Sequence, residues 1–239
     1  MDRKPLLCEL HAHSTWSDGT LTITELVDLY GFNGFDVLCL TDHVFTSEDR
    51  RYRVWPENHD AYLCVIDREA RRAREQYDLL LVPGLELTQI APTPDEAGHA
   101  LAIGLRSFVS LDDGLVAAMR SAREEGAAIV AAHPHGEKDD PNSLRTTRFF
   151  RRHWQELHGL VDRYELVNRT QTFGWVATAG LPGIATGDFH RLEQLASWKT
   201  LLPCEKSERS VVDYLRSNAR AYVVPWHLGD ESDGRRVAA

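Results

Sequence analysis

Short runs of apolar residues recur along the chain, and they are rich in Leu, Val and Ile with few polar interruptions. Runs without alternating polar positions are typical of strands that are buried on both faces. We therefore predict buried strands at residues 6–10, 35–40, 79–82, 100–105, 127–132, 164–167, 184–186 and 222–224.

Helical patterns lie between several of these runs. Residues 22–30 begin with Thr22 and Glu25, which have the spacing of a capping box, and continue with apolar residues on one face. A second helix is predicted at residues 57–76. A third is predicted at residues 110–126, with two aspartates in its first turn and a glycine at its end. The alternation of strands and helices predicts one domain with a parallel sheet covered by helices.

The positions of polar residues distinguish a closed barrel from an open, doubly wound sheet. In a β/α barrel the loops after several strands build the active site, whereas an open sheet gathers its chemistry at one switch point. Five predicted strand ends are followed by residues that can bind metal, namely His11 and His13, Asp42 and His43, Glu86, His133, and Asp188 and His190. This distribution favours a closed or nearly closed barrel.

Composition and charge narrow the class of protein. The 239 residues include 36 acidic residues and 27 Lys or Arg, giving a formal net charge of −9, so extended nucleic-acid binding is not expected. No apolar run approaches the roughly 18 residues of a membrane span, and residues 1–10 do not read as a signal peptide. We expect a cytoplasmic protein. Its four cysteines (Cys8, Cys39, Cys64 and Cys204) form no CxxC pair and are expected to be reduced core residues.

The candidate chemistry begins with His11 and His13. Side chains two residues apart in a strand point to the same face, as chelation of one ion requires, although paired strand histidines are also found without metal. Asp18, followed by a glycine, adds a hard oxygen ligand nearby. Glu86 follows an apolar run, where an unpaired carboxylate carries a large desolvation cost, so a cation or an arginine must face it.

Two further histidines have small or apolar neighbours. His133 follows a predicted strand, whereas His99 precedes one, which departs from the barrel rule; a hydrogen-bonded core histidine is the alternative for His99. The candidates exceed what one ion needs: His11, His13, Asp18, His43, Glu86, His99, His133, Asp188 and His190.

The order of these motifs resembles that of the PHP (polymerase and histidinol phosphatase) family. The motifs span residues 8 to about 200 and are His11-Ala12-His13 with Ser17-Asp18-Gly19, Thr41-Asp42-His43, Gly84-Leu85-Glu86, His99, His133-Pro134 and Asp188-Phe189-His190. The resemblance implies a single-domain, distorted (β/α)7 TIM-like barrel over residues 1–228, with the metal site at the C-terminal face of its strands. Residues 229–239 are expected to form a flexible polar tail.

The resemblance also implies two to three divalent ions (Zn, Mn or Fe). It assigns the first to His11, His13, Glu86 and Asp188, the second to Glu86 as a bridge with His99 and His133, and the third to Asp18, His43 and His190. Some family members have His where Asp18 stands, and oxygen in place of nitrogen shifts the preference of that position toward Mn or Fe.

The function implied is a metal-dependent phosphoesterase that acts on a small phosphorylated metabolite or nucleotide through a metal-bridged hydroxide. Glu86 and Asp188 would hold the catalytic ions, and Asp42 would orient a ligand imidazole. His135, Arg169 and Arg191 are candidates for substrate contact. Two alternatives stay open: a PHP-type hydrolase of amides, esters or carbamates, and a non-catalytic metal-binding PHP module. The sequence does not indicate an oligomeric state.

Overall fold

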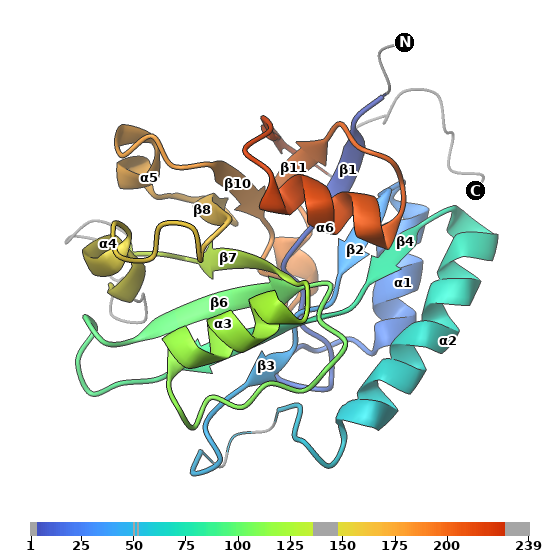
Figure 1. Cartoon of the computed structure of the whole chain (residues 1–239). Helices are drawn as coiled ribbons and strands as arrows, with labels where there is room; N and C mark the ends of the chain where they lie inside the picture. The colour runs from blue at the N-terminus through green and yellow to red at the C-terminus, as the bar shows by residue number, and fades with distance from the viewer. Residues whose placement is uncertain (1–3, 50, 52, 136–147, 228–239) are drawn as a thin grey trace.

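Strands and helices alternate through the described part of the computed structural model, which comprises residues 4–49, 51, 53–135 and 148–227 (Figure 1). The strands are β1 (Leu6–Glu9), β2 (Val37–Cys39), β3 (His43–Val44), β4 (Leu80–Val82), β5 (Gly84–Gln89), β6 (Gly98–Ile103), β7 (Ala128–Ala132), β8 (Arg163–Asn168), β9 (Gln171–Thr172), β10 (Gly183–Thr186), β11 (Trp198–Leu202) and β12 (Tyr222–Pro225). The helices are α1 (Ile23–Phe32), α2 (His59–Tyr77), α3 (Leu115–Glu124), α4 (Phe149–His153), α5 (Gly174–Thr178) and α6 (Glu208–Arg216), with a short 3₁₀ helix η2 (Leu192–Gln194).

The strands form two hydrogen-bonded sheets. The first has the order β12-β11-β1-β2-β4, and the second has the order β10-β8-β7-β6-β5-β3 with β9 paired to β8. β1, β2 and β4 are parallel, but β6 is antiparallel to both of its neighbours, and β11 and β12 are antiparallel as well. The expected all-parallel sheet is therefore wrong, and the protein is of mixed α/β class.

The two sheets are joined at the ends of β1 and β10. His13 N donates to Phe189 O at 2.8 Å and Phe189 N donates to His11 O at 3.0 Å, on either side of a parallel bridge between Ala12 and Phe189. Alternate side chains of strands from both sheets also meet in one apolar cluster, which includes Cys8, Val37, Leu101 and Val130. The closed seven-stranded barrel stays a prediction, and this seam and the shared cluster support it.

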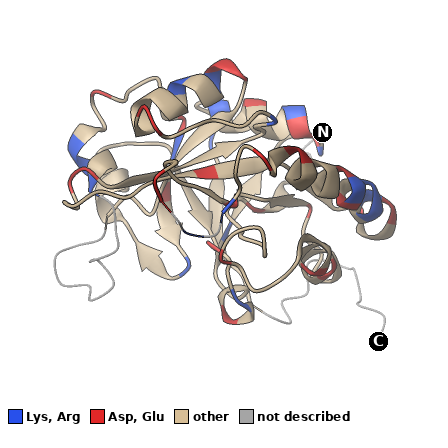
Figure 2. Ribbon diagram, turned by 90° about the horizontal axis from the view of Figure 1, so that it is seen from below, with Lys and Arg blue, Asp and Glu red and all other residues tan. Residues whose placement is uncertain are grey.

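Helix α1 begins as its sequence predicts. The Thr22 hydroxyl accepts from Glu25 N, and the Glu25 carboxylate accepts from Thr22 N, so the capping box is confirmed. The apolar face of α1 is buried and packs beside α2. In Figure 2 acidic and basic residues are interspersed on α2, and Arg72 there forms ion pairs with Glu69 and Asp28. Glu69 is buried and Arg72 is 25% exposed, so this ion-pair network is largely buried, whereas Arg68 and Arg74 on the same helix are exposed.

Several expectations need correction. α3 begins at Leu115 after the Gly114 cap and not at residue 110, because Asp112 instead accepts from Ser47 N. The sequence did not predict β3, β5, β9 and β11, or the helices α4, α5 and α6. All four cysteines are free, but only Cys8 and Cys39 are buried; Cys64 is exposed and Cys204 is half-buried.

The predicted tail at residues 229–239 lies outside the described residues. None of the helices in the described ranges is both long enough and apolar enough to span a bilayer.

Candidate metal centre

The nine predicted ligands come together from the segments that follow β1, β7 and β10, from β3, from the third residue of β5 and from the start of β6. Three groups have ligand atoms that all lie within 4.8 Å of one another: His11, His13 and Asp188; His11, Glu86 and His133; and His13, Asp18, His43 and His190. His99 joins the second group through Glu86, since its Nδ1 lies 3.0 Å from Glu86 Oε1. These groups resemble the three ligand sets expected from the sequence, with His11 and His13 shared between them.

His11 and His13 leave β1 side by side, as their two-residue spacing predicts. Both side chains are fully buried, and their Nε2 atoms are 3.0 Å apart. His11 Nδ1 donates to Glu165 Oε1 at 2.8 Å, and His13 Nδ1 lies 3.4 Å from the Ser17 hydroxyl. Because each Nδ1 faces a partner on the outside of the site, each Nε2 is directed toward the shared centre.

Burial lowers the pKa of both imidazoles, but their charged neighbours act in opposite directions. Asp188, Glu86 and Glu165 raise the pKa of His11 more than burial lowers it, so its net pKa is well above the usual value. The pKa of His13 is well below the usual value because burial, His190 and His43 all lower it. The two adjacent imidazoles thus lie in opposite electrostatic surroundings, with carboxylates around His11 and imidazoles around His13.

Glu86 lies at the middle of the cluster on β5. Its Oε1 is 3.0 Å from His99 Nδ1 and 3.2 Å from His133 Nε2, and its side chain is 1% exposed. Burial raises the pKa of this carboxyl, but His43, His11 and His99 lower it more, so the net pKa is well below the usual value. The groups that face this carboxylate in the described structure are imidazoles, and the cation or arginine expected from the sequence stays a prediction.

The second oxygen of Glu86 shows that the site fits a cation. Oε2 lies 2.8 Å from His43 Nδ1 and 3.4 Å from His13 Nε2, yet it receives no well-formed hydrogen bond from any residue in the described ranges. A buried oxygen without a hydrogen bond is costly unless a cation occupies the space before it. The mixture of imidazole nitrogens and carboxylate oxygens suits Zn, Mn or Fe.

His99 reaches the cluster because β6 runs antiparallel to β5. The register pairs Thr88 with His99 and His99 with Ala132, so the start of β6 lies beside the ends of β5 and β7. The apparent departure from the barrel rule is thus a consequence of strand direction. The pKa of His99 is lowered, first by burial and then by His133 and His43, although Glu86 opposes this.

Asp18 and His190 form the open side of the cluster. Asp18 Oδ1 is 3.1 Å from His190 Nε2 and 3.4 Å from His43 Nε2, and the Asp18 side chain is 59% exposed. The turn that carries Asp18 is tight, because a Cβ at Gly19 would lie 2.2 Å from His13 O. Glycine at this position lets Asp18 approach the histidine pair.

Asp188 and His133 both have left-handed backbone, with φ of 42° and 28°. Non-glycine residues in this region are strained, and such strain clusters at functional sites. Asp188 Oδ1 lies 3.5 Å from His11 Nε2, and Arg169 pairs with the other oxygen, Oδ2, at 3.0 Å. Burial raises the pKa of Asp188, but His11, His190 and Arg169 lower it more, to well below the usual value.

The sequence predicts that Asp42 orients a ligand imidazole, but its hydrogen bonds in the structure come from two serines. Its carboxylate accepts from Ser14 N and Ser14 Oγ at 2.8 Å and from Ser17 Oγ at 2.6 Å. It therefore holds the loop after His13 and reaches that imidazole only through Ser17. Burial raises the pKa of Asp42, and the hydrogen bonds from both serines counteract this.

Glu165 on β8 is a buried carboxylate that sequence reasoning missed. Besides His11 Nδ1, it accepts from Thr186 Oγ1 at 2.6 Å, from Asn168 Nδ2 at 2.8 Å and from His133 N at 2.5 Å. The signal was present, since a glutamate inside the apolar run 164–167 needs partners in the same way as Glu86 does.

The three candidates for substrate contact lie at different places. Arg169 is 39% exposed and lies at the cluster, where its guanidinium also donates to Asp188 O. His135 is buried two residues beyond His133, and burial together with Arg148 and Arg151 lowers its pKa. Arg191 is exposed and caps η2 through its backbone N.

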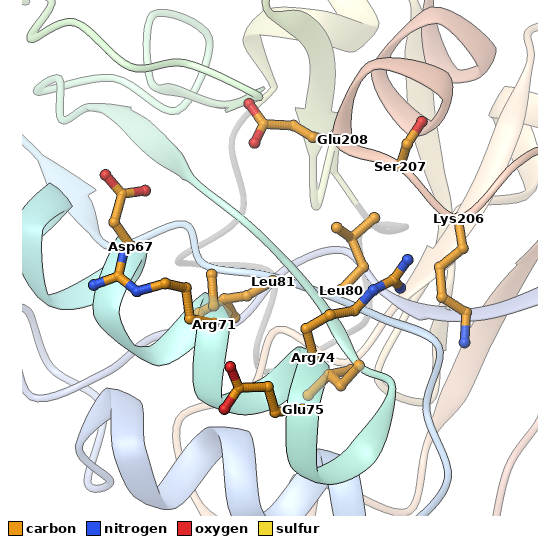
Figure 3. Close-up of a pocket in the computed structure, with 11 residues that line it drawn as sticks. Asp67, Arg71, Arg74, Glu75, Leu80, Leu81, Lys206, Ser207 and Glu208 are labelled. Atoms are coloured by element: carbon orange, nitrogen blue, oxygen red, sulfur yellow. The ribbon is translucent and has the colours of Figure 1, made fainter.

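A pocket of about 590 Å³ lies elsewhere, between α2, β4 and the start of α6 (Figure 3). Its lining includes Arg74 and Lys206, which form ion pairs with Asp78, and Lys206 also pairs with Asp36. None of the predicted ligands lines this pocket.

Comparison with known proteins places the chain near phosphate-ester hydrolases. No family model matches it. The chain is 27% identical over 206 residues to a 3',5'-nucleoside bisphosphate phosphatase of Chromobacterium violaceum, covering 80% of this chain and 61% of that protein. The chain thus spans less than two thirds of the length of this relative.

Two solved structures share the fold. A two-domain protein from Bacteroides vulgatus that contains a predicted PHP-like metal-dependent phosphoesterase superposes with a TM-score of 0.67 at 25% identity, over 93% of this chain and 65% of that one. An amidohydrolase from Chromobacterium violaceum with bound sulfate superposes with a TM-score of 0.52 at 16% identity, over 77% of this chain and 87% of that one, which is a likeness of fold alone. The sequence and structural relatives are consistent with the PHP resemblance.

Proposed function

We propose that this chain is a metal-dependent phosphoesterase that hydrolyses a small phosphorylated metabolite or nucleotide. The observation that carries the proposal is the Glu86 carboxylate, which is buried among imidazoles with one oxygen lacking a hydrogen bond from the described residues. The names of the relatives supply the reaction class. In this proposal Glu86 lies between two ions, and Asp188 and Asp18 bind on either side of His11 and His13.

Divalent ions in such a site acidify water and neutralise the charge of a phosphoryl group. The residues of the chain hold the ligands in place and supply further positive charge. Arg169 is held by Asp188 while its side chain is 39% exposed, so it can bind a phosphoryl oxygen beside the cluster. Asp18, at 59% exposed, is the most exposed of the nine ligands, and a substrate would approach there.

A nucleoside bisphosphate is the substrate that we propose first. The 27% identical relative has this activity in its name, and the chain offers two sets of basic groups. One is Arg169 beside Asp188, and the other is Arg148 and Arg151, whose charges act on His135 and of which Arg148 pairs with Asp95. A substrate with two phosphates would contact both, whereas a monophosphate would contact one.

Metal content is the first test. We expect two to three divalent ions per chain, and elemental analysis of protein purified without added metal would identify them as Zn, Mn or Fe. At most one ion at saturation would contradict the multinuclear centre. A panel of nucleoside bisphosphates, phosphomonoesters, phosphodiesters and carboxyl esters would then follow, and turnover of carboxyl esters alone would contradict phosphoesterase activity.

The bond cleaved is the second test. If water attacks phosphorus, turnover in oxygen-18 water places the label in the phosphate product. Asp188→Asn and His13→Asn should abolish turnover, because each removes a ligand from the first group. Label found only in the alcohol product would mean cleavage at carbon, and full activity in both variants would mean that these residues do not hold the catalyst.

A further inference from the structure

A buried ion pair lies immediately beneath the candidate metal centre. Glu9, the last residue of β1, and Lys199 of β11 are both 0% exposed, and Lys199 Nζ is 2.6 Å from Glu9 Oε2. Neither residue belongs to the groups that could hold an ion. Removing two charges from water costs free energy that offsets the attraction between them. A gain in stability therefore does not by itself explain why this pair is buried.

The other contacts of Glu9 connect two segments that carry metal ligands. Its Oε1 accepts from the backbone N of Leu10 at 3.1 Å, of His11 at 3.2 Å and of Gly187 at 2.8 Å. His11 begins the histidine pair, and Gly187 directly precedes Asp188. A single carboxylate oxygen therefore ties the chain at His11 to the chain at Asp188.

The position of Gly187 shows how closely this contact is packed. A Cβ at Gly187 would lie 2.2 Å from Glu9 Oε2 and 2.5 Å from Lys199 Nζ, which is too close for either atom to stay in place. The second oxygen, Oε2, is held by Lys199 and by the Tyr30 hydroxyl at 3.2 Å, and Lys199 Nζ also donates to Ser197 Oγ. These partners fix the orientation in which Oε1 faces the three amides.

We propose that Glu9 is a positioning residue of the metal centre. Its Oε1 sets the spacing between the His11–His13 segment and the Asp188–His190 segment, and Lys199 holds the carboxylate in the required orientation. Glu9 contacts no ligand side chain in the described structure and acts through the backbone. The inference rests on the proposed metal-dependent function.

The test is titration of the metal-free protein with Co²⁺, followed by visible absorption, which reports the affinity and coordination geometry without turnover. Two double variants both remove the ion pair: Glu9→Gln/Lys199→Met keeps an acceptor oxygen, and Glu9→Met/Lys199→Met removes it. We expect the first to bind within about threefold of the parent affinity and the second to lose roughly tenfold or more, as for other residues that orient ligands. Equal affinities in the two folded double variants would overturn the proposal.

Gly187→Ala is a second variant that does not depend on removing buried charges. It keeps every partner but displaces the carboxylate, so we expect lower Co²⁺ affinity and a changed absorption spectrum. If the Met/Met variant does not fold, an unchanged affinity and spectrum for Gly187→Ala would overturn the proposal.

The matched control is Asp162→Asn. Asp162 also accepts a backbone N–H, from Ile129, and pairs with a cation, Arg123, but it lies at the opposite ends of β7 and β8 from the ligands. We expect this variant to bind Co²⁺ with the parent affinity, and an equal loss there would overturn the proposal. A parent protein that binds no Co²⁺ would overturn the proposed function itself, and the inference with it.

Discussion

Glu86 and His99 make unequal contributions to the candidate centre, although they contact each other. The Glu86 carboxylate faces imidazoles from both of its oxygens, whereas His99 contacts one of those oxygens, Oε1, and packs against the His133 ring. We expect Glu86→Gln to lower both bound metal and turnover more than His99→Asn does, because Glu86 would serve two ions and His99 one. Metal analysis and initial rates of the two variants check this. Equal losses at equal residual metal would contradict the bridging role.

Individual residues also show which contacts could not be predicted from the sequence. The ligand candidates could be found because His, Asp and Glu after apolar runs are conspicuous in the sequence. Glu165 and Glu9 lie inside such runs, and their partners are separated from them by most of the chain. Which charges meet across that distance depends on strand order, so these two contacts could not be predicted from the local pattern.

Eight of the twelve strands and three of the six α-helices of the described residues could be predicted, because apolar runs and the capping box are local features of the sequence. Strand direction could not. Nothing in the apolar run of β6 indicates that this strand is antiparallel to its neighbours. His99 lies in the cluster because of that direction. The late start of α3 was missed for a related reason: Asp112, which reads as a first-turn residue, instead accepts from Ser47 N, a residue distant in the sequence.

The turn after β1 supports a prediction at the same scale. Gly19→Ala would place a Cβ 2.2 Å from His13 O, so the turn that carries Asp18 must shift. We expect a loss of stability of about 1–3 kcal/mol from overpacking, together with weaker binding of the ion beside Asp18. Thermal unfolding and metal titration measure the two effects separately.

Gly174→Ala is the control for this prediction. A Cβ at Gly174, the first residue of α5, would meet nothing within 4 Å, and alanine there restricts the unfolded chain. We expect a gain of about 0.4–1 kcal/mol and unchanged metal affinity. Unchanged metal binding in Gly19→Ala as well would show that Asp18 is not held by this turn.

The whole molecule should lose stability in alkaline solution because of its buried thiols. Burial raises the pKa of the Cys8 and Cys39 thiols well above the usual value. As the pH rises, the thiols of the unfolded chain lose their protons first, at about pH 8.5. The free energy of unfolding therefore falls from that pH upward, until the pH reaches the folded-state pKa. We expect Cys39→Ala to reduce the decline in unfolding free energy by up to about 1.4 kcal/mol per pH unit, measured by urea unfolding under reducing conditions.

Cys64→Ala is the control for the thiol prediction, because Cys64 is exposed in the folded protein. Its unfolding free energy should follow the same pH dependence as that of the parent protein. A parent protein whose stability does not decline between pH 8 and 10 would contradict the prediction.

The seam between Ala12 and Phe189 has a consequence for how the protein is made. His11 and His13 leave the ribosome before Asp188 and His190, which emerge only after β2 to β10 have been made. The first and third ligand groups therefore cannot form on a nascent chain until residue 190 has been released. Until then the histidine pair has neither its seam hydrogen bonds nor its carboxylate neighbours. Metal loading of these two groups would thus come late, after translation through residue 190, whereas the second group is complete once residue 133 has been made.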